Sequence, residues 1–255
     1  MKRPNPFHRL KSPRGSHNGS NHAIQNAILL SLPPKECHRI FGKCQVIDLP
    51  KHTVINEIGA PIKFSYFMNS GLASILSVMS SGKSVEVGLV GREGFVGLPV
   101  TAGFTSSPTR AVMQVGGNAC RISAPDLKDC LRKCPALEIA LKRFSQTLTL
   151  QATQAAACNR VHEVGQRLAR WLLLSLDRLD GVDVPLTQDS LASMLGTRRA
   201  SVTVAAGILQ RAGLITYRRG DLKIDNRSGL EKASCECYAA LKRQNEKWKS
   251  EVDTD

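Results

Sequence analysis

Short hydrophobic runs broken by turn residues dominate the first half of the chain. Over residues 44–123, β-prone runs alternate with turns that contain glycine, asparagine or serine. The runs are 46–47, 53–55, 64–67, 73–76, 85–87 and 111–113. Regular short strands of this kind predict an antiparallel sandwich or barrel. Ahead of them, apolar residues at helical spacing over 23–42 predict two short helices, divided by Pro33 and Pro34.

A different periodicity begins at Pro135, where alanine, leucine and glutamine dominate. Apolar positions alternate at four and three residues, which predicts a long helix over 135–162. The stripe consists of Leu137, Leu141, Phe144, Leu148, Gln151, Ala155 and Cys158. The length of the helix and the small residues near its end favour a homodimer interface. An amphipathic helix packed on its own domain would show a similar stripe. A second helix is expected over 163–179.

Residues 185–224 carry the pattern that is most informative about function. Thr187 is a good N-cap for a short helix, and Gly196 allows a sharp turn before a second helix over 198–212. The apolar face of that second helix is formed by Val202, Ala205, Ala206 and Leu209, and Arg199, Thr203 and Gln210 fall on the opposite face. Two β-prone runs then flank an arginine-containing turn at 218–221. This order predicts a winged helix-turn-helix.

The charge of the chain agrees with a polyanionic partner. Lys+Arg is 35 and Asp+Glu is 21 in 255 residues, which gives a formal net charge of +14. Nucleic acid is the first expectation and an anionic membrane the second. Residues 1–22 contain five Lys/Arg and no acid, so they are expected to form a mobile basic tail. A supporting contact of this tail with DNA phosphates is the alternative.

Two classes of protein are disfavoured by composition. No apolar run approaches the roughly 20 residues that span a bilayer, and no signal-peptide core follows the basic start, so we expect a cytoplasmic protein. The eight cysteines lack paired C-x2-C spacings, so free thiols and no cofactor are expected, with a redox or metal role as the alternative. Phosphate loops, metal-binding histidine pairs and Gly-x-Ser-x-Gly elbows are missing, which argues against an enzyme.

Three stretches of the sequence resemble one protein family, in the order in which that family has them. Residues 186–215 are similar to the helix-turn-helix of the Crp/Fnr superfamily of bacterial transcription regulators. Residues 159–173 resemble that family's link from the dimer helix, and residues 57–73 resemble its cyclic-nucleotide-binding-type β-roll. The resemblance implies an α+β fold with an N-terminal antiparallel β-roll sensor domain, a long dimerisation helix and a C-terminal winged helix-turn-helix. It also implies a homodimer on double-stranded DNA, with RNA polymerase as a partner if the protein activates.

The resemblance and the composition together predict five segments. These are a flexible basic tail (1–22), a cyclic-nucleotide-binding-like β-roll domain (23–134), a dimerisation helix (135–162), a winged helix-turn-helix DNA-binding domain (163–228) and a charged C-terminal extension (229–255). No segment is expected to interact with a membrane.

The expected DNA contacts lie on the helix-turn-helix and the wing. They are Thr187, Gln188, Arg198, Arg199, Ser201, Thr203, Arg218 and Arg219. Arg199 is retained where the family reads guanine, whereas Ala200 and Val204 stand where other members carry a glutamate and a second arginine. The operator is therefore expected to differ from the usual family sequence. We expect Arg199 to meet a base edge and Arg218 and Arg219 to meet phosphates.

The expected effector pocket departs from the cyclic-AMP pattern of the family. Leu98 stands where a carboxylate would hold the ribose, and Arg110 is shifted by one place relative to the phosphate-binding arginine. Cyclic AMP is therefore not expected to bind tightly. The candidate pocket residues for another small-molecule effector are Glu93, Gly97, Leu98, Thr109, Arg110 and Thr153. A ligand-binding module without DNA, and a DNA-binding regulator with a vestigial sensor, are the alternatives.

Overall fold

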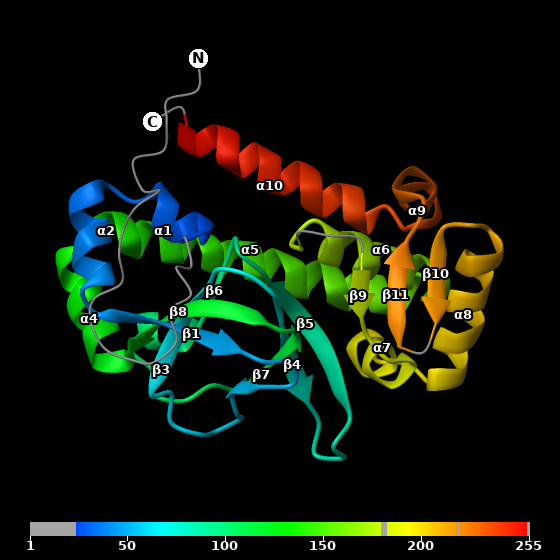
Figure 1. Ribbon diagram of the computed structural model, residues 1–255, viewed down its shortest axis with the longest axis horizontal. Coiled ribbons are helices and arrows are strands. Elements are labelled where there is room, and N and C mark those ends of the chain that lie inside the picture. The colour runs from blue at the N-terminus through cyan, green and yellow to red at the C-terminus, as the bar shows by residue number, and fades with distance from the viewer. Residues whose placement is uncertain (1–23, 180–182, 219, 254–255) are drawn as a thin grey trace.

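Two antiparallel β-sheets and a mainly helical domain are arranged along one long helix in the computed structural model (Figure 1). The structure describes residues 24–179, 183–218 and 220–253. The predicted basic tail, residues 1–22, lies outside the described residues. Within the described ranges, no helix is both long enough and apolar enough to cross a membrane.

The two sheets of the N-terminal domain contain four strands each. The first sheet runs in the order β1 (Cys44–Leu49), β8 (Gly117–Ser123), β3 (Phe64–Met68) and β6 (Phe95–Val96). The second runs in the order β2 (Val54–Asn56), β7 (Arg110–Val115), β4 (Leu72–Val78) and β5 (Ser84–Val90). All neighbouring strands are antiparallel. The six predicted runs are all strands, and the antiparallel β-roll is confirmed.

Two strands, β6 and β8, and two short helices of this domain were not predicted from the sequence. β8 lies in the middle of its sheet, between β1 and β3, but its sequence mixes glycine, asparagine, arginine and serine with apolar residues. β6 has only two residues. The helix α4 (Ala124–Lys133) starts after Ser123, whose hydroxyl accepts a hydrogen bond from the Asp126 backbone N–H. A serine cap followed by proline is a helix start signal that the analysis of the sequence missed.

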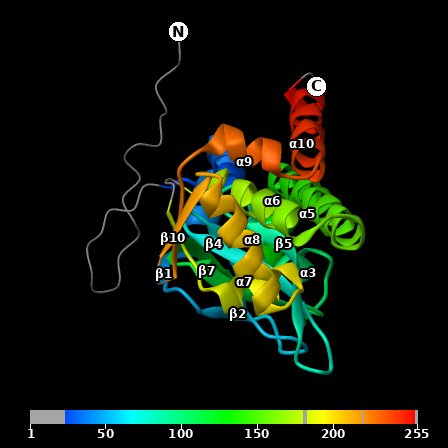
Figure 2. The same cartoon turned by 90° about the vertical axis from the view of Figure 1, so that its right-hand side faces the viewer.

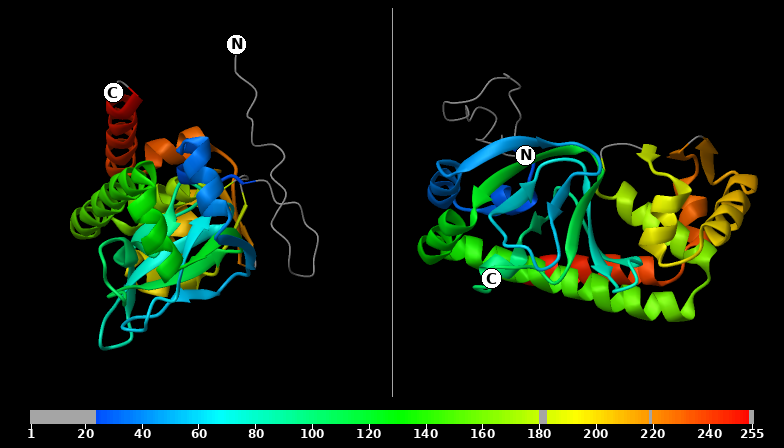
Figure 3. Two further views of the ribbon diagram at one scale, coloured as in Figure 1. Left: turned by 90° about the vertical axis from the view of Figure 1, so that its left-hand side faces the viewer. Right: turned by 90° about the horizontal axis from the view of Figure 1, so that it is seen from below.

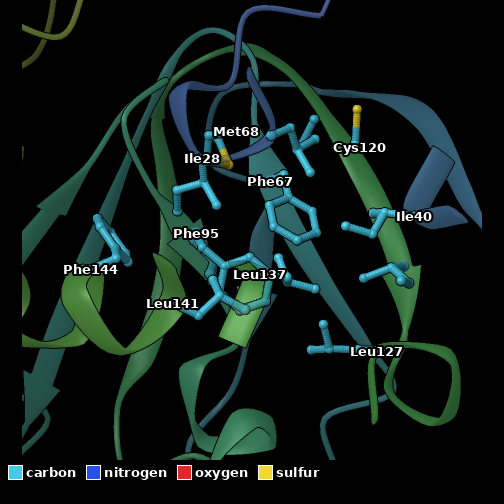
Figure 4. Close-up of a cluster of buried hydrophobic side chains, with 14 of the residues drawn as sticks. Ile28, Ile40, Phe67, Met68, Phe95, Cys120, Leu127, Leu137, Leu141 and Phe144 are labelled. Atoms are coloured by element: carbon cyan, nitrogen blue, oxygen red, sulfur yellow. The ribbon is translucent and has the colours of Figure 1, made fainter. Parts of the chain in front are cut away.

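Helices close the roll on the side where the first sheet carries its largest side chains. The helices are α1 (Ala27–Ser31), α2 (Pro34–Phe41), α3 (Leu98–Thr101), α4 and α5 (Pro135–Val161). Their apolar residues pack with Phe67 and Phe95, whose ring centroids lie 4.7 Å apart (Figure 4). Buried Asn26 caps α1 and donates hydrogen bonds to the carbonyls of Met68 and Gly94, both at 2.8 Å. This pairing satisfies a buried polar side chain and fixes α1 on the sheet.

The stripe on α5 packs on its own domain, which corrects the expectation that it forms the dimer interface. Leu137, Leu141, Phe144, Gln151, Ala155 and Cys158 are buried within the single chain, and half-buried Leu148 packs against the core of the roll. The Oε1 atom of Gln151 accepts a hydrogen bond of 3.1 Å from the buried backbone N–H of Leu89 in β5. The heptad period identified the apolar face of the helix correctly, but the same chain covers this face. The β-roll covers its first part, and Cys235 and Cys237 of the C-terminal extension cover Cys158.

The C-terminal domain begins directly after α5. Its helices are α6 (Val164–Leu176), α7 (Gln188–Leu195), α8 (Arg199–Arg211), α9 (Arg227–Ala233) and α10 (Cys237–Asp253). A three-stranded antiparallel sheet has the order β10 (Ile215–Arg218), β11 (Asp221–Ile224) and β9 (Asp183–Pro185). Helices α7 and α8 lie together at the end of the molecule farthest from α1 and α2 (Figures 1 and 2). The winged helix-turn-helix is confirmed.

The charged C-terminal extension, whose structure the sequence left open, forms helix for most of its length. α10 turns back from α9 and runs beside α5 (Figures 1 and 3). Tyr238 and Leu241 on its first turns are buried against the rest of the chain. The extension therefore connects the winged domain to the long helix.

Candidate nucleic-acid interface

The turn between α7 and α8 is built from two local signals in the sequence. The Thr187 hydroxyl accepts a hydrogen bond of 3.2 Å from the Ser190 N–H and so caps α7. Gly196 ends α7 in the left-handed region, at φ 57°, a conformation that favours glycine. A side chain here would also press on Val85 of β5. Val202, Ala205, Ala206 and Leu209 are buried, as the sequence predicted.

The surface end of α8 carries two arginines. Arg198 is the N-cap residue and Arg199 is the first helical residue, so the helix begins one residue later than predicted. The guanidinium of Arg199 lies 3.3 Å from a carboxylate oxygen of Asp189 on α7, and the Arg199 side chain is 65% exposed. An exposed ion pair of this kind contributes little to stability. It holds the guanidinium at the start of the helix, where its hydrogen-bond donors stay available.

Polar residues next to Arg199 join the two helices of the motif. The Thr203 hydroxyl donates a hydrogen bond of 2.7 Å to the side-chain oxygen of Gln188. Thr203 is exposed and Ser201 is half-buried. The structure thus brings Thr187, Gln188, Arg198, Arg199, Ser201 and Thr203 together at one end of the helix pair, as expected.

Three further surface residues of α8 were not selected as contacts from the sequence. Val204 and Ile208 are 63% and 53% exposed, one turn apart, and Arg211 lies exposed at the last helical position. Val204 stands at the position where other family members carry a second arginine. The sequence signal that could have identified Ile208 is its position four residues after Val204, outside the four buried positions of α8. Large exposed apolar side chains on a polar helix face indicate a contact surface.

The wing is tied to α8 and to the start of α7. The backbone N–H of Tyr217 in β10 donates a hydrogen bond of 2.9 Å to the side-chain oxygen of Gln210. The Tyr217 hydroxyl donates a hydrogen bond to the carbonyl of Leu186. Arg218, at the end of β10, is exposed and paired in register with Asp221. Arg219, the other predicted wing contact, lies outside the described residues.

The candidate effector residues nearest α3 have structural roles. Glu93 accepts a 2.8 Å hydrogen bond from the Arg178 side chain, which forms an ion pair with it. Gly97 has a φ of 119°, and a side chain there would collide with Ser65. Leu98 starts α3 and packs on the core of the roll. Glu93 is thus engaged by Arg178, and Gly97 and Leu98 have no polar side-chain atom to offer a ligand.

The other candidate effector residues also contact neighbouring protein groups. Thr109 bonds with Ser107 at 3.1 Å, and Arg110 forms an ion pair with Glu57 at 3.1 Å. Thr153 is exposed on α5, and its hydroxyl donates to a backbone carbonyl of the same helix. Each of these three side chains is therefore engaged by a neighbouring group of the protein.

The β-roll and the winged domain contact each other through a buried polar cluster. Glu86 of β5 accepts a 2.8 Å hydrogen bond from the Trp171 indole N–H of α6, and the Ser74 hydroxyl also donates to it. Desolvation raises the pKa of the Glu86 carboxyl to about 7, against the lowering effect of Ser74, Trp171, Arg170 and Arg178. The adjoining cavity has a volume of about 20 Å³, which accommodates about one water molecule and no nucleotide.

The raised pKa of Glu86 predicts a pH-dependent stability. The unfolded chain ionises Glu86 near the ordinary pKa of 4.5, whereas the folded chain ionises it near 7. The stabilisation is therefore complete below pH 4.5 and is lost as the pH rises through about 7. Relative to wild type, Glu86→Gln is expected to gain about 1–3 kcal/mol of unfolding free energy between pH 5 and pH 8. Denaturant titrations at both pH values test this, and an unchanged difference would contradict it.

Comparisons with known proteins agree with this geometry. The sequence model of the cyclic nucleotide-binding domain matches residues 46–134, and the model of the Crp-like helix-turn-helix domain matches residues 166–233. A search of curated proteins gave no match.

Several solved structures share this fold. A protein of Eubacterium rectale, described as a transcriptional regulator of the crp/fnr family, is 15% identical with a TM-score of 0.65, covering 82% of this chain and 98% of its own. The c-di-GMP-responsive global regulator CLP of Xanthomonas campestris is 18% identical with a TM-score of 0.62, covering 75% and 99%. FixK2 of Bradyrhizobium japonicum is 14% identical with a TM-score of 0.62, covering 75% and 98%.

At these identities the solved structures establish the fold, and the two family models assign its two domains. Their order, with α5 between the β-roll and the helix-turn-helix, is the order observed here. The chain therefore belongs to the Crp/Fnr superfamily of transcription regulators.

Proposed function

We propose that the protein is a homodimeric transcription regulator that binds an inverted-repeat operator in double-stranded DNA. The observation that carries this proposal is the start of α8, where Arg198 and Arg199 lie exposed beside the polar side chains of α7. In helix-turn-helix proteins this end of the second helix enters the major groove. The net charge of +14 supplies the attraction to a polyanion.

The side chains on the exposed face of α8 determine which bases the protein would read. The Arg199 guanidinium suits guanine, whose O6 and N7 accept two parallel hydrogen bonds. Val204 and Ile208 present apolar surface that suits a thymine methyl group. The wing arginines would contact phosphates, which position the protein without selecting a sequence.

The exposed face of α5 is the surface we propose for the dimer. A second set of residues at four- and three-residue spacing lies opposite the buried stripe. It consists of Ile139, Arg143, Gln146, Leu150, Thr153 and Ala157, exposed except for half-buried Leu150. Two copies of this face would place two α8 helices in successive major grooves, with half-sites about 10 bp apart or a multiple of that distance.

Control by an effector at the β-roll is part of the proposal, with the ligand unidentified. Leu98 offers no acceptor for a ribose hydroxyl, and Glu93 is engaged by Arg178. Cyclic AMP is therefore not the effector we propose. If the β-roll binds no ligand, the addition of small metabolites will leave DNA binding unchanged. RNA polymerase is the expected partner if the regulator activates.

Arg199→Ala should remove the preference for one base at the same position in both half-sites. The expected loss of discrimination is about 1–3 kcal/mol, because a bidentate arginine–guanine contact is removed. The measurement is selection of operators from random DNA, followed by binding of single-base variants at several salt concentrations.

Arg132→Ala on α4 is the matched control, because Arg132 is also highly exposed and paired with an aspartate. We expect it to leave base preference and affinity unchanged. If Arg199→Ala and Arg132→Ala behave alike, α8 does not read the sequence. If the wild-type chain binds no DNA even in low salt, a ligand-binding module without DNA replaces the proposal.

A further inference from the structure

Three cysteines and one histidine converge where α5, α6 and α10 meet. Cys158 and His162 lie four residues apart at the end of α5, and Cys235 and Cys237 flank the start of α10. Their ligand atoms all lie within 4.8 Å of one another. The three cysteines are buried, and the His162 side chain is only 12% exposed. The proposed regulator function uses none of these four side chains.

The distances within the cluster match a single tetrahedral ion. Zn²⁺ with sulfur ligands at 2.3 Å separates two sulfurs by about 3.8 Å, and a sulfur from a histidine nitrogen by about 3.6 Å. The Sγ atoms of Cys158 and Cys235 are 3.5 Å apart, and Cys237 Sγ lies 3.6 Å from His162 Nδ1. A small movement of each side chain brings all four atoms to the same centre.

Neighbouring polar side chains form hydrogen bonds to two of the four candidate ligands, as groups around the ligands of zinc sites commonly do. The Nε2 atom of His162 lies 2.9 Å from a carboxylate oxygen of Glu236, which leaves Nδ1 directed at the sulfurs. The side-chain amide of Gln154 donates to Cys237 Sγ at 3.0 Å. Carboxylate–histidine pairs of this type orient the ring and raise its basicity toward a metal.

Two buried arginines lie near the cluster. The positive charge of Arg170 acts on Cys158. Arg167 also interacts electrostatically with Cys158. Three thiolates around a divalent ion leave one net negative charge, which these two buried arginines offset.

We propose that Cys158, His162, Cys235 and Cys237 bind one structural Zn²⁺ ion. Four protein ligands complete a tetrahedron and leave no open position, which is the arrangement of structural zinc sites. A disulfide between Cys158 and Cys235 would leave Cys237 and His162 without a role. An iron–sulfur cluster would hold its ligands at separate iron atoms, farther apart than these four.

The ion would fasten the C-terminal extension to the joint between the two domains. His162 and Glu163 separate α5 from α6, so two ligands stand at the end of the long helix and two at the start of α10. The individual spacings, C-x3-H and C-x-C, are weak signals, and the two halves lie more than 70 residues apart. For this reason the sequence favoured free thiols.

The proposal is tested on the full chain, purified without chelators and without reductants that bind metals. Elemental analysis is expected to show one zinc per chain. Replacement by Co²⁺ is expected to give the intense visible bands of tetrahedral cobalt and a sulfur-to-cobalt charge-transfer band. Mass spectrometry after thiol alkylation should show Cys158, Cys235 and Cys237 protected until a chelator is added.

Substitutions distinguish a specific loss of zinc binding from a general loss of folding. Cys237→Ser and His162→Ala should lose the zinc, whereas Cys130→Ser, at a buried cysteine in α4, should retain one ion per chain. Glu236→Gln keeps every ligand and should weaken zinc affinity about 10- to 100-fold. Since the cobalt spectrum is recorded on the wild-type chain, unfolding of a variant leaves the test intact.

Three results would overturn the proposal. One is a folded wild-type chain that binds neither zinc nor cobalt. Another is a Cys158–Cys235 disulfide in the chain as purified, mapped by mass spectrometry. The third is full zinc content in folded Cys237→Ser and His162→Ala. None of these measurements involves DNA, so the outcome is independent of the proposed regulator function.

Discussion

Leu141→Ala is expected to lower the free energy of unfolding by about 2–5 kcal/mol. Leu141 is 1% exposed in the single chain and belongs to the core of the β-roll, so removing its side chain leaves a cavity there. Met79→Ala, just after β4 and outside the proposed dimer face, is the matched control. Met79 is 50% exposed, and we expect a change within about 0.5 kcal/mol. Denaturant titrations followed by circular dichroism measure both.

The exposed face of α5 is tested by the effect of a substitution on oligomeric state. Leu150→Lys, on the exposed face of α5, should yield folded monomers at concentrations at which the wild-type chain sediments as a dimer. Comparable destabilisation by Leu141→Ala and Met79→Ala would show that the stripe is not the core. A Leu150→Lys variant that remains dimeric would place the dimer interface elsewhere.

Trp171→Ala is expected to cost about 3–5 kcal/mol of unfolding free energy. The Trp171 side chain is 2% exposed and packs α6 against the β-roll, and its indole N–H donates to Glu86. Trp171→Phe keeps most of the apolar surface and removes only the donor. We expect it to cost about 1–3 kcal/mol, because the partly buried carboxylate of Glu86 loses a hydrogen bond.

The second tryptophan of the chain provides the control. Trp248 lies half-buried on α10, far along the sequence from the domain contact. Trp248→Phe should change stability by less than Trp171→Phe and leaves Trp171 as the single indole for fluorescence. Equal losses in the two phenylalanine variants would mean that the Glu86 hydrogen bond contributes nothing.

Features encoded within a few neighbouring residues could be predicted from the sequence. The threonine cap, the turn glycine and the four apolar positions of α8 each specify local geometry, so the winged motif and the buried face of α8 agree with expectation. The resemblance to the superfamily supplied the order of the domains. The sequence did not show that Asp189 would pair with Arg199, since this depends on the angle between two helices.

Features that depend on distant segments could not be predicted in the same way. The period of α5 shows which face is apolar but not which surface covers it, so the β-roll took the place assigned to a second chain. The candidate effector residues were chosen from alignment with a pattern that Leu98 had already broken. In the structure, Glu93 turns instead to Arg178, a residue 85 positions away.

Gln151 constrains how the long helix can move relative to the β-roll. Its side-chain oxygen accepts from the buried N–H of Leu89, a donor that would cost about 1–3 kcal/mol if left without a partner. Displacement of α5 relative to β5 would stretch this bond and is resisted by that cost. Under the proposed function, an effector-driven shift of α5 would therefore have to carry β5 with it or break this contact.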